Sequence, residues 1–280
     1  MERLEQPIPN NDDVLPEKIR TAKHITGRES EFSIKHEDNP KYTPNLSSAN
    51  YGNISRVSAR VEKDGRFRER SLVLKRYKVS SLEYLNDAIR LRDEAVEVYG
   101  KLKEAGLENL PSTFRAVDDV EILMEDYNIN DNIAIAHNKI KEVRDIKIES
   151  LTNFEKIIDD MFSDVVKASV KGIIITGDAY FVVIPKKGNH IEIKRVAIAD
   201  LEMVHPHNFQ FRQLTSPKEV EEVYKDNVLE FAGVFAGLNL GGNFFVSEDY
   251  LESLSEQAKN ILLSPDRVQQ VREDWERSIV

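Results

Sequence analysis

The spacing of apolar residues changes several times along this chain, and each change marks a predicted element. From Asn50 to Tyr77, two extended runs flank the turn signal Lys63-Asp64-Gly65. The second run holds the apolar residues 72–74 and then Lys75. Extended runs joined by such a turn are typical of a β-hairpin. We therefore predict two strands, with Lys75 near the end of the second.

Helical spacing is clearest over residues 80–105, where large apolar side chains form a stripe that we centre on Val96. At 100° per residue, Glu97 lies on the border of that stripe and Glu94 lies nearly opposite Val96. Glu97 is then the better placed of the two acids to reach a partner beside the core. Weaker or shorter helical patterns predict further helices over 131–145, 152–170, 217–226, 248–262 and 265–278.

The segment from Gly172 to Glu202 predicts a second hairpin. Apolar runs around 173–175, 181–184 and 191–199 are interrupted by Gly177-Asp178 and by a polar turn at 186–189. Asp178 precedes the first hairpin strand and Asp200 follows the second, so the two carboxylates can lie close together. Paired carboxylates suit Mg²⁺, which prefers oxygen ligands, and they also suit phosphoryl transfer.

The remaining patterns suggest a division of the chain. Residues 1–45 are polar and contain five prolines, which predicts an extended arm. Residues 46–127 read strand, strand, helix, strand, strand and end in the polar stretch Glu125 to Asn128. Residues 128–280 read as mainly helical, with the hairpin 173–202 at their centre. The predicted fold class is therefore α+β.

Composition narrows the chemistry further. The chain has 280 residues and no cysteine, which removes disulfides, thiolate metal sites and cysteine nucleophiles. No apolar run is long enough to span a bilayer, and the N-terminus lacks a secretory signal, so we expect a cytoplasmic protein. The net charge of −10 opposes general binding to nucleic acid. The basic residues between Arg56 and Arg76 read as a solvated strand edge.

The order of these features resembles the protein-kinase-like fold over roughly residues 50–202. The features are a hairpin ending in Val-Leu-Lys75, a helix with a border glutamate, two strands, the Met-Glu-Asp-Tyr connection, a helix, Gly-Asp178 and Asp200. The Gly-Asp form and the later Asp-Leu-Glu are closer to aminoglycoside phosphotransferases and related small kinases. The resemblance implies two lobes, a small β-rich one and a mainly helical one.

The resemblance also implies roles for individual residues. Lys75 matches the lysine that grips the α- and β-phosphates of ATP, and Glu97, or alternatively Glu94, matches its helix partner. The connection from Met124 through Glu125 to Tyr127 matches the segment whose backbone meets adenine. Asp178 matches the acid that orients the attacking hydroxyl. Asp200 matches the acid that binds Mg²⁺, or Mn²⁺ in its place, and Glu202 is a further candidate ligand.

Several positions depart from the family pattern. The loop over the phosphates is rich in glycine in the family, whereas Gly52 is the single glycine between Ser47 and Arg56. The histidine of the catalytic loop falls on Thr176, and the metal-binding asparagine falls on Val183. Asn189 or Glu202 would have to compensate for that asparagine. An activation segment closing in Ala-Pro-Glu is absent from the sequence.

Two other constellations rank lower. His205 and His207 lie near Asp200 and Glu202, but a His-Pro-His run after a strand is more typical of a solvated loop than of a zinc site. The glycines between 233 and 242 lack the Lys-Ser/Thr that follows a phosphate-binding loop.

Three functional hypotheses follow. The first is a kinase-like phosphotransferase that moves the γ-phosphoryl group of ATP to a hydroxyl of an unidentified small molecule or protein. The second is a weakly active or inactive pseudokinase that binds a protein partner. The third is an unrelated α+β protein whose hairpin only mimics the site.

Overall fold

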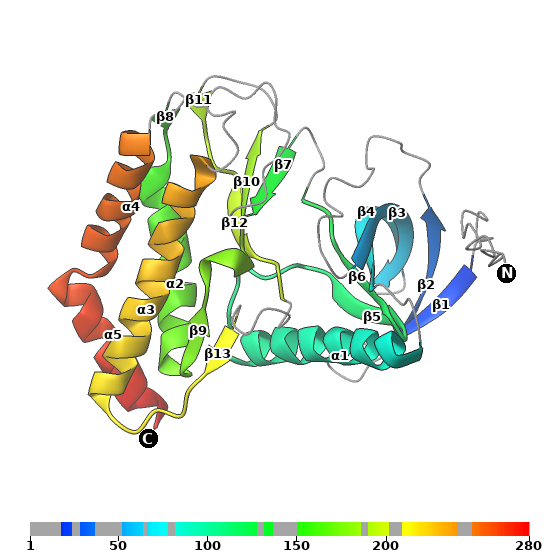
Figure 1. Ribbon diagram of the computed structural model, residues 1–280, viewed down its shortest axis with the longest axis horizontal. Coiled ribbons are helices and arrows are strands. Elements are labelled where there is room, and N and C mark those ends of the chain that lie inside the picture. The colour runs from blue at the N-terminus through cyan, green and yellow to red at the C-terminus, as the bar shows by residue number, and fades with distance from the viewer. Residues whose placement is uncertain are drawn as a thin grey trace, which may run out of the picture.

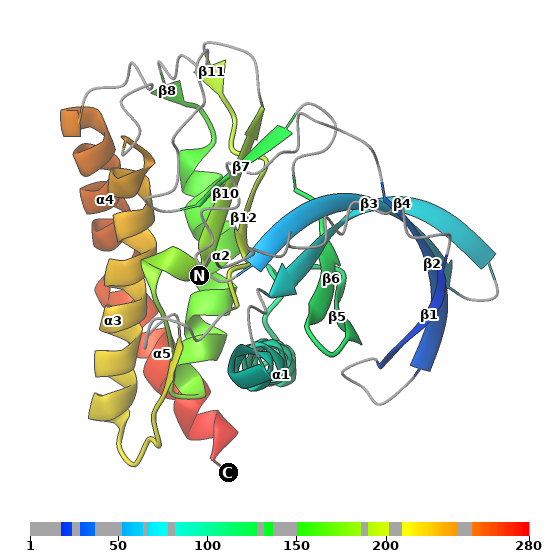
Figure 2. The same cartoon turned by 45° about the vertical axis from the view of Figure 1, so that its right-hand side comes forward.

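The N-terminal part of the protein is a closed antiparallel barrel in the order β1-β2-β3-β4-β6-β5 (Figure 2). The computed structural model describes residues 18–23, 29–36, 52–63, 66–77, 82–127, 132–136, 150–185, 190–201, 209–239 and 248–279. The barrel strands are β1 (Lys18–Lys23), β2 (Glu29–His36), β3 (Gly52–Lys63), β4 (Arg66–Tyr77), β5 (Phe114–Asp118) and β6 (Glu121–Glu125). β1 and β5 close the barrel where Lys23 pairs with Ala116.

The structure differs from the sequence expectation over residues 1–45. Both β1 and β2 pair with their neighbours in the barrel, so at least these two segments extend the sheet and do not form a separate arm. Phe32 and Ile34 alternate with polar residues in β2, which is a strand period carried by only two large apolar side chains. That signal was too weak to separate from the proline-rich sequence around it.

Strand β4 has two faces with different surroundings. Leu72 and Leu74 join Val57, Val117 and Leu123 in a cluster of their own within the barrel strands. Tyr77 instead belongs to the main core, together with residues of helix α1 (Leu82–Glu104). Because side chains alternate along a strand, Lys75 lies on the Tyr77 face and not on the Leu74 face.

Helix α1 is buried along a different line from the one expected. Ala88, Leu91, Ala95, Val98 and Leu102 are buried, whereas Val96 is only half-buried. The buried face is therefore centred near Ala95, about 100° away from Val96 around the helix. The expected phase was wrong because it weighted large side chains, while two alanines allow the helix to approach the sheet.

The described C-terminal part is mainly helical, and its long helices pack against one another (Figure 1). They are α2 (Phe154–Val170), α3 (Pro217–Ala236), α4 (Glu248–Leu262) and α5 (Pro265–Ser278). The patterns for α2, α4 and α5 are confirmed. Helix α3 runs ten residues beyond its expected end and passes through Gly233, because Phe231 and Phe235 continue its buried face. Among the described residues, no helix is long and apolar enough to cross a bilayer.

Short strands connect the barrel to these helices. Strand β10 (Tyr180–Pro185) pairs with β12 (Arg195–Ile198) on one side and with β7 (Asn132–Ala136) on the other. The helix expected over 131–145 is therefore wrong in its first part, where Ile133 and Ile135 alternate with smaller residues as in a strand. The other pairs are β9 (Ile173–Ile175) with β13 (Phe209–Phe211), and β8 (Ser150–Leu151) with β11 (His190–Ile191).

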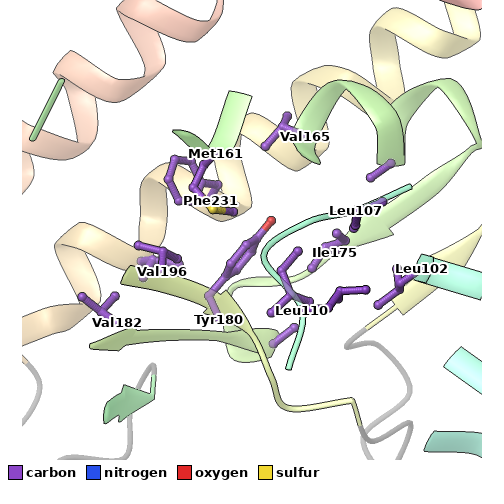
Figure 3. Packing of buried hydrophobic residues seen from close by; sticks show 14 of the residues in the cluster. Leu102, Leu107, Leu110, Met161, Val165, Ile175, Tyr180, Val182, Val196 and Phe231 are labelled. Atoms are coloured by element: carbon purple, nitrogen blue, oxygen red, sulfur yellow. The ribbon is translucent and has the colours of Figure 1, made fainter. Parts of the chain in front are cut away.

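The main core runs from α1 through the hairpin strands to α5. Tyr180 lies inside it, and Figure 3 shows its ring among Met161, Val196 and Phe231. The Tyr180 and Phe231 ring centroids are 5.6 Å apart. A short 3-10 helix, Gly177–Ala179, precedes Tyr180 and carries Asp178. The buried Tyr180 thus anchors the chain two residues after Asp178.

Candidate functional site

Lys75 is a buried lysine at the end of the barrel that faces the rest of the molecule. It lies opposite Ile54 on β3 and Ile122 on β6, and only 8% of its surface is exposed. Its ammonium nitrogen is 5.6 Å from the centroid of the Tyr77 ring. A buried ammonium needs compensating negative charge or hydrogen bonds, so this location favours anionic groups nearby.

Tyr77 lies on the same face of β4 as Lys75, and two acidic residues act on its phenol. The residue is 1% exposed, and its hydroxyl has no hydrogen-bond partner within the part of the chain that the structure describes. Burial raises the pKa of the Tyr77 phenol above its usual value, the charges of Asp200 and Glu94 raise that pKa further, and Arg92 lowers it. Asp200, which follows β12, and Glu94, on α1, therefore lie close enough to Tyr77 for their charges to act on its phenol.

The two candidate glutamates of α1 occupy different environments. Glu97 is 65% exposed and forms an ion pair of 2.7 Å with Lys101, one turn along the helix. Glu94 is about one-third exposed, accepts a hydrogen bond of 2.8 Å from Arg90, and acts on the Tyr77 phenol. Glu94, the alternative candidate, is thus the more buried of the two, whereas Glu97 lies at the surface.

Asp178 and Asp200 lie at the open end of the same hairpin, one before β10 and one after β12. Tyr180 pairs with Ile198 at the last position of the antiparallel β10–β12 ladder. Asp178 and Asp200 each lie two residues beyond that pair, Asp178 in the 3-10 helix and Asp200 after β12. The two segments stay in contact just beyond the ladder, because the N–H groups of Ala199 and Asp200 donate hydrogen bonds to the carbonyl of Ala179 at 2.9 and 3.2 Å. The Asp178 side chain is exposed, and Asp200 is half-buried.

Helix α3 supports the segment before Asp178 through polar side chains. Glu230 accepts a hydrogen bond of 2.7 Å from the backbone N–H of Gly177. Asn227, fully buried, accepts from the N–H of Ile175 at 2.8 Å and donates to the Ile173 carbonyl at 2.8 Å. Sequence reasoning missed both residues, because a polar residue on a helix carries no sign of the strand it will contact.

A glycine sets the spacing at the other end of this segment. Gly172 has a φ of +69°, and a Cβ built there would lie 2.0 Å from the carbonyl oxygen of Arg212. The Gly172 carbonyl also accepts a hydrogen bond of 2.8 Å from the Arg212 N–H. The chain leading to Asp178 and the chain that follows β13 therefore touch through their backbones.

The connection after β6 is held from several sides. Glu125 accepts a hydrogen bond of 2.7 Å from the Ser112 N–H and pairs with Arg195 at 3.3 Å. Arg195 also donates to the Leu110 carbonyl at 2.6 Å and lies 5.5 Å from the ring centroid of Tyr127. The Met124–Tyr127 segment, expected to meet adenine, is thus tied to β12. Met124 itself is half-buried against the main core.

Val183 lies in the middle of β10 and points into a small apolar cluster. It packs with Tyr127, Ala197 and Ala199, and Phe181 contacts the same cluster. The Tyr127 and Phe181 rings meet edge to face with centroids 6.3 Å apart. The Val183 side chain is a hydrocarbon buried in this cluster, so it offers no metal ligand.

The structure describes only part of the expected residue set. Gly52 begins β3 and lies opposite Tyr77 at the end of the β3–β4 ladder. Thr176 is half-buried and directly precedes the 3-10 helix. Glu202, Asn189, His205 and His207 lie outside the described residues. Within the described ranges, no three His, Asp or Glu side chains are grouped closely enough to hold a metal by themselves.

Comparison with known proteins gives limited help. No protein-family model matches the chain, and no curated protein matches it. Two similar solved structures are of the Rio2 kinase from Chaetomium thermophilum, one of them as an ADP/Mg²⁺-phosphoaspartate complex. The complex is 12% identical, with 88% of this chain and 80% of that chain covered at a TM-score of 0.34. The other structure is also 12% identical, with 88% and 82% covered at a TM-score of 0.33.

Proposed function

We propose that this chain has a two-lobed, protein-kinase-like fold and acts as an ATP-dependent phosphotransferase. One observation carries the proposal: the Lys75 ammonium lies 5.6 Å from the Tyr77 ring centroid, and the charges of Asp200, after β12, and Glu94, on α1, act on the phenol of the same Tyr77. These residues come from three separate parts of the chain, with Glu94 and Lys75 lying 106 and 125 positions before Asp200. A lysine, a helix glutamate and a post-hairpin aspartate are the groups that a kinase-type site requires.

The topology supports the same proposal. Strands β3 and β4, helix α1, and strands β5 and β6 follow one another in the order expected for the smaller lobe. Strand β6 lies between β4 and β5. The last residues of β6, Met124 and Glu125, therefore pair with β4, the strand that carries Lys75, and the chain continues from there to Tyr127. The larger lobe then comprises the hairpin and helices α2 to α5.

Nucleotide binding would rest mainly on charge and on the connection after β6. The Lys75 ammonium would hold the α- and β-phosphates, with Glu94 fixing the direction of the lysine side chain. The backbone between Met124 and Tyr127 would meet the adenine. Arg195 ties Glu125 to β12, so this connection would be held in place before nucleotide arrives.

The residues near Asp200 fit a magnesium ion, with Mn²⁺ as the alternative metal. Carboxylate oxygen is the ligand type that Mg²⁺ prefers, and the buried Tyr77 hydroxyl beside Asp200 has no partner within the described residues. When bound, such an ion neutralises charge on the β- and γ-phosphates. Asp200 would hold it, and Glu202 is a further candidate.

Asp178 is the residue that we assign to the acceptor. It is exposed at the start of the hairpin, where an incoming hydroxyl can reach it, and Glu230 holds the preceding backbone in position. Its carboxylate would accept a hydrogen bond from that hydroxyl and orient the oxygen for attack on the γ-phosphorus. Positioning and charge neutralisation would supply most of the rate enhancement.

The acceptor is more consistent with a small molecule than with an extended peptide. Strand β13 ends at Phe211, and helix α3 starts at Pro217 with a capping box between Ser216 and Glu219. Sixteen residues, 201–216, separate Asp200 from the start of α3, too few for a long substrate-binding segment. A protein acceptor that presents a folded surface remains compatible with this arrangement.

The packing around Val183 favours a second candidate, a pseudokinase that binds nucleotide weakly or acts through a protein partner. Tyr127 and Phe181 fill the space beside Val183 with apolar side chains. A site with fewer metal ligands than an active kinase would bind without efficient transfer.

A thermal-shift titration tests the proposal. ATP is added at millimolar concentration to the full chain, with and without Mg²⁺ or Mn²⁺, because a ligand that binds only the folded state raises Tm. We expect a rise in Tm for the natural chain and its loss in Lys75→Ala. The matched control is Lys101→Ala, which removes a surface lysine paired with Glu97. No rise at all would refute nucleotide binding, and a rise without ATP turnover would favour the pseudokinase.

A further inference from the structure

The hairpin that carries the two aspartates is unusually tight at its open end. Strand β10 begins at Tyr180, only two residues after Asp178, and Ala179 between them receives hydrogen bonds from both Ala199 and Asp200. No loop therefore separates Asp178 from the ladder. The Asp178 backbone is held one residue from the peptide that fixes Asp200.

This geometry determines which residue could share a metal ion with Asp200. A kinase-type site has an asparagine five residues after the catalytic aspartate, and that asparagine binds metal. Here the fifth residue is Val183, which is 5% exposed, pairs with Arg195 and Ala134, and packs against Tyr127. Asp178, in contrast, directly precedes Ala179, whose carbonyl accepts a hydrogen bond of 3.2 Å from the Asp200 N–H.

The surroundings of Asp200 give an independent reason to expect a ligand there. Tyr77 is 1% exposed, and its hydroxyl has no hydrogen-bond partner among the described residues. Burial of an unpaired hydroxyl is costly. After burial itself, the charge of Asp200 is the largest cause of the raised pKa of the Tyr77 phenol. A bound ion with its waters, or a phosphate oxygen, would give that hydroxyl a partner.

Resting on the proposed function, we infer that Asp178 is a metal ligand in its own right and completes with Asp200 the site that Val183 cannot serve. Asp178 and Asp200 would hold the metal together, and the second carboxylate oxygen of Asp178 would remain for the acceptor hydroxyl. A single aspartate thus serves the two positions that a kinase-type site divides between an aspartate and an asparagine.

The experiment measures nucleotide affinity with and without metal. The probe is the β,γ-imido analogue of ATP, which is not turned over, titrated into the full chain by calorimetry in the presence of Mn²⁺ or of EDTA. We expect Asp178→Asn to raise the Kd for the Mn²⁺ complex by at least about tenfold, as changes around a metal typically do. The Kd in EDTA should stay within about twofold, because Lys75 holds the phosphates without metal.

Controls separate this inference from the proposed function. Asp160→Asn removes an exposed aspartate of α2 that pairs with Lys156, and it should change neither Kd. Asp200→Asn should behave as Asp178→Asn does. An Asp178→Asn variant that keeps the full effect of Mn²⁺ would overturn the metal role while leaving the phosphotransferase intact. Failure of the natural chain to bind the analogue under both conditions would overturn the proposed function itself. Asp178→Ser provides a second variant if Asp178→Asn does not fold.

Discussion

Glu230 of helix α3 accepts a hydrogen bond of 2.7 Å from the backbone N–H of Gly177, the residue that precedes Asp178. The contact joins residues 53 positions apart and crosses from the helical layer to the turn of the hairpin. A carboxylate acceptor is charged, so this bond is stronger than one between neutral groups. The position of Asp178 is therefore set from α3 as well as from its own strand.

Replacing Glu230 with alanine should release that turn. We expect kcat to fall roughly 10- to 100-fold, because small displacements of a reacting group are costly, while the KM for ATP stays nearly constant. Hydrogen exchange at the Gly177 amide should accelerate in the same variant, which gives a readout independent of activity. Glu222→Ala on the exposed side of α3 is the control. Unchanged Gly177 exchange in Glu230→Ala would contradict the prediction.

Asn227 should matter for folding more than for chemistry. Its side chain bonds Ile175, Ile173 and Ser169 in a fully buried position, so removal leaves several polar groups unpaired. We expect Asn227→Ala to lower the free energy of unfolding by at least about 2 kcal/mol. Leu229→Ala changes an exposed residue of the same helix and should stay within about 0.5 kcal/mol. Similar losses for both variants in denaturant titrations would contradict this.

Tyr77 offers a stability test of opposite sign. Tyr77→Phe removes a buried hydroxyl that lacks a partner, so we expect the ligand-free protein to gain up to about 1 kcal/mol of stability. Tyr224→Phe is the matched control, because its hydroxyl donates to the Leu262 carbonyl at 2.6 Å. That control should lose about 1 kcal/mol. A comparable loss in both variants would show that the Tyr77 hydroxyl has a partner.

The start of α3 should respond to acid. Hydrogen bonds from Thr215, and then from Ser216, lower the pKa of Glu219 below its usual 4.5. A lowered pKa means that the charged form stabilises the fold. This stability is complete above pH 4.5 and is lost as pH falls through the lower pKa of the folded state.

The measurement for this prediction compares the natural chain with Glu219→Gln in denaturant titrations at several pH values. We expect the natural chain to be the more stable of the two near neutral pH. The difference should shrink steadily below pH 4.5. A difference that does not depend on pH would show that the charge of Glu219 contributes nothing.

The sequence predicted the elements better than their faces. Helices α2, α4 and α5 follow from regular stripes of large side chains, and the hairpin with its two aspartates follows from its bounded apolar runs. The orientation of α1 did not, because Ala88 and Ala95 bury a face that large residues do not mark. That error in phase is also why Glu97 ranked above Glu94.

The site was predictable to the extent that each residue belonged to a local pattern. Lys75 lies near the end of β4 and Asp200 follows β12, and these locations on the chain were enough to single them out. The support from Asn227 and Glu230, and the tie between Glu125 and Arg195, depend on residues far apart in sequence. Such contacts arise only when the helical layer packs against the strands, so no local spacing reveals them.

Gly172 leaves no room for change at the place where two passes of the backbone meet. Any side chain there would collide with the Arg212 carbonyl, and that atom belongs to the main chain and cannot swing aside. To avoid this collision, β13 would have to move away from β9. Because β9 leads directly into the turn that bears Asp178, such a movement would also displace that turn. A residue with no functional group of its own thereby limits how far this part of the protein can diverge while keeping its shape.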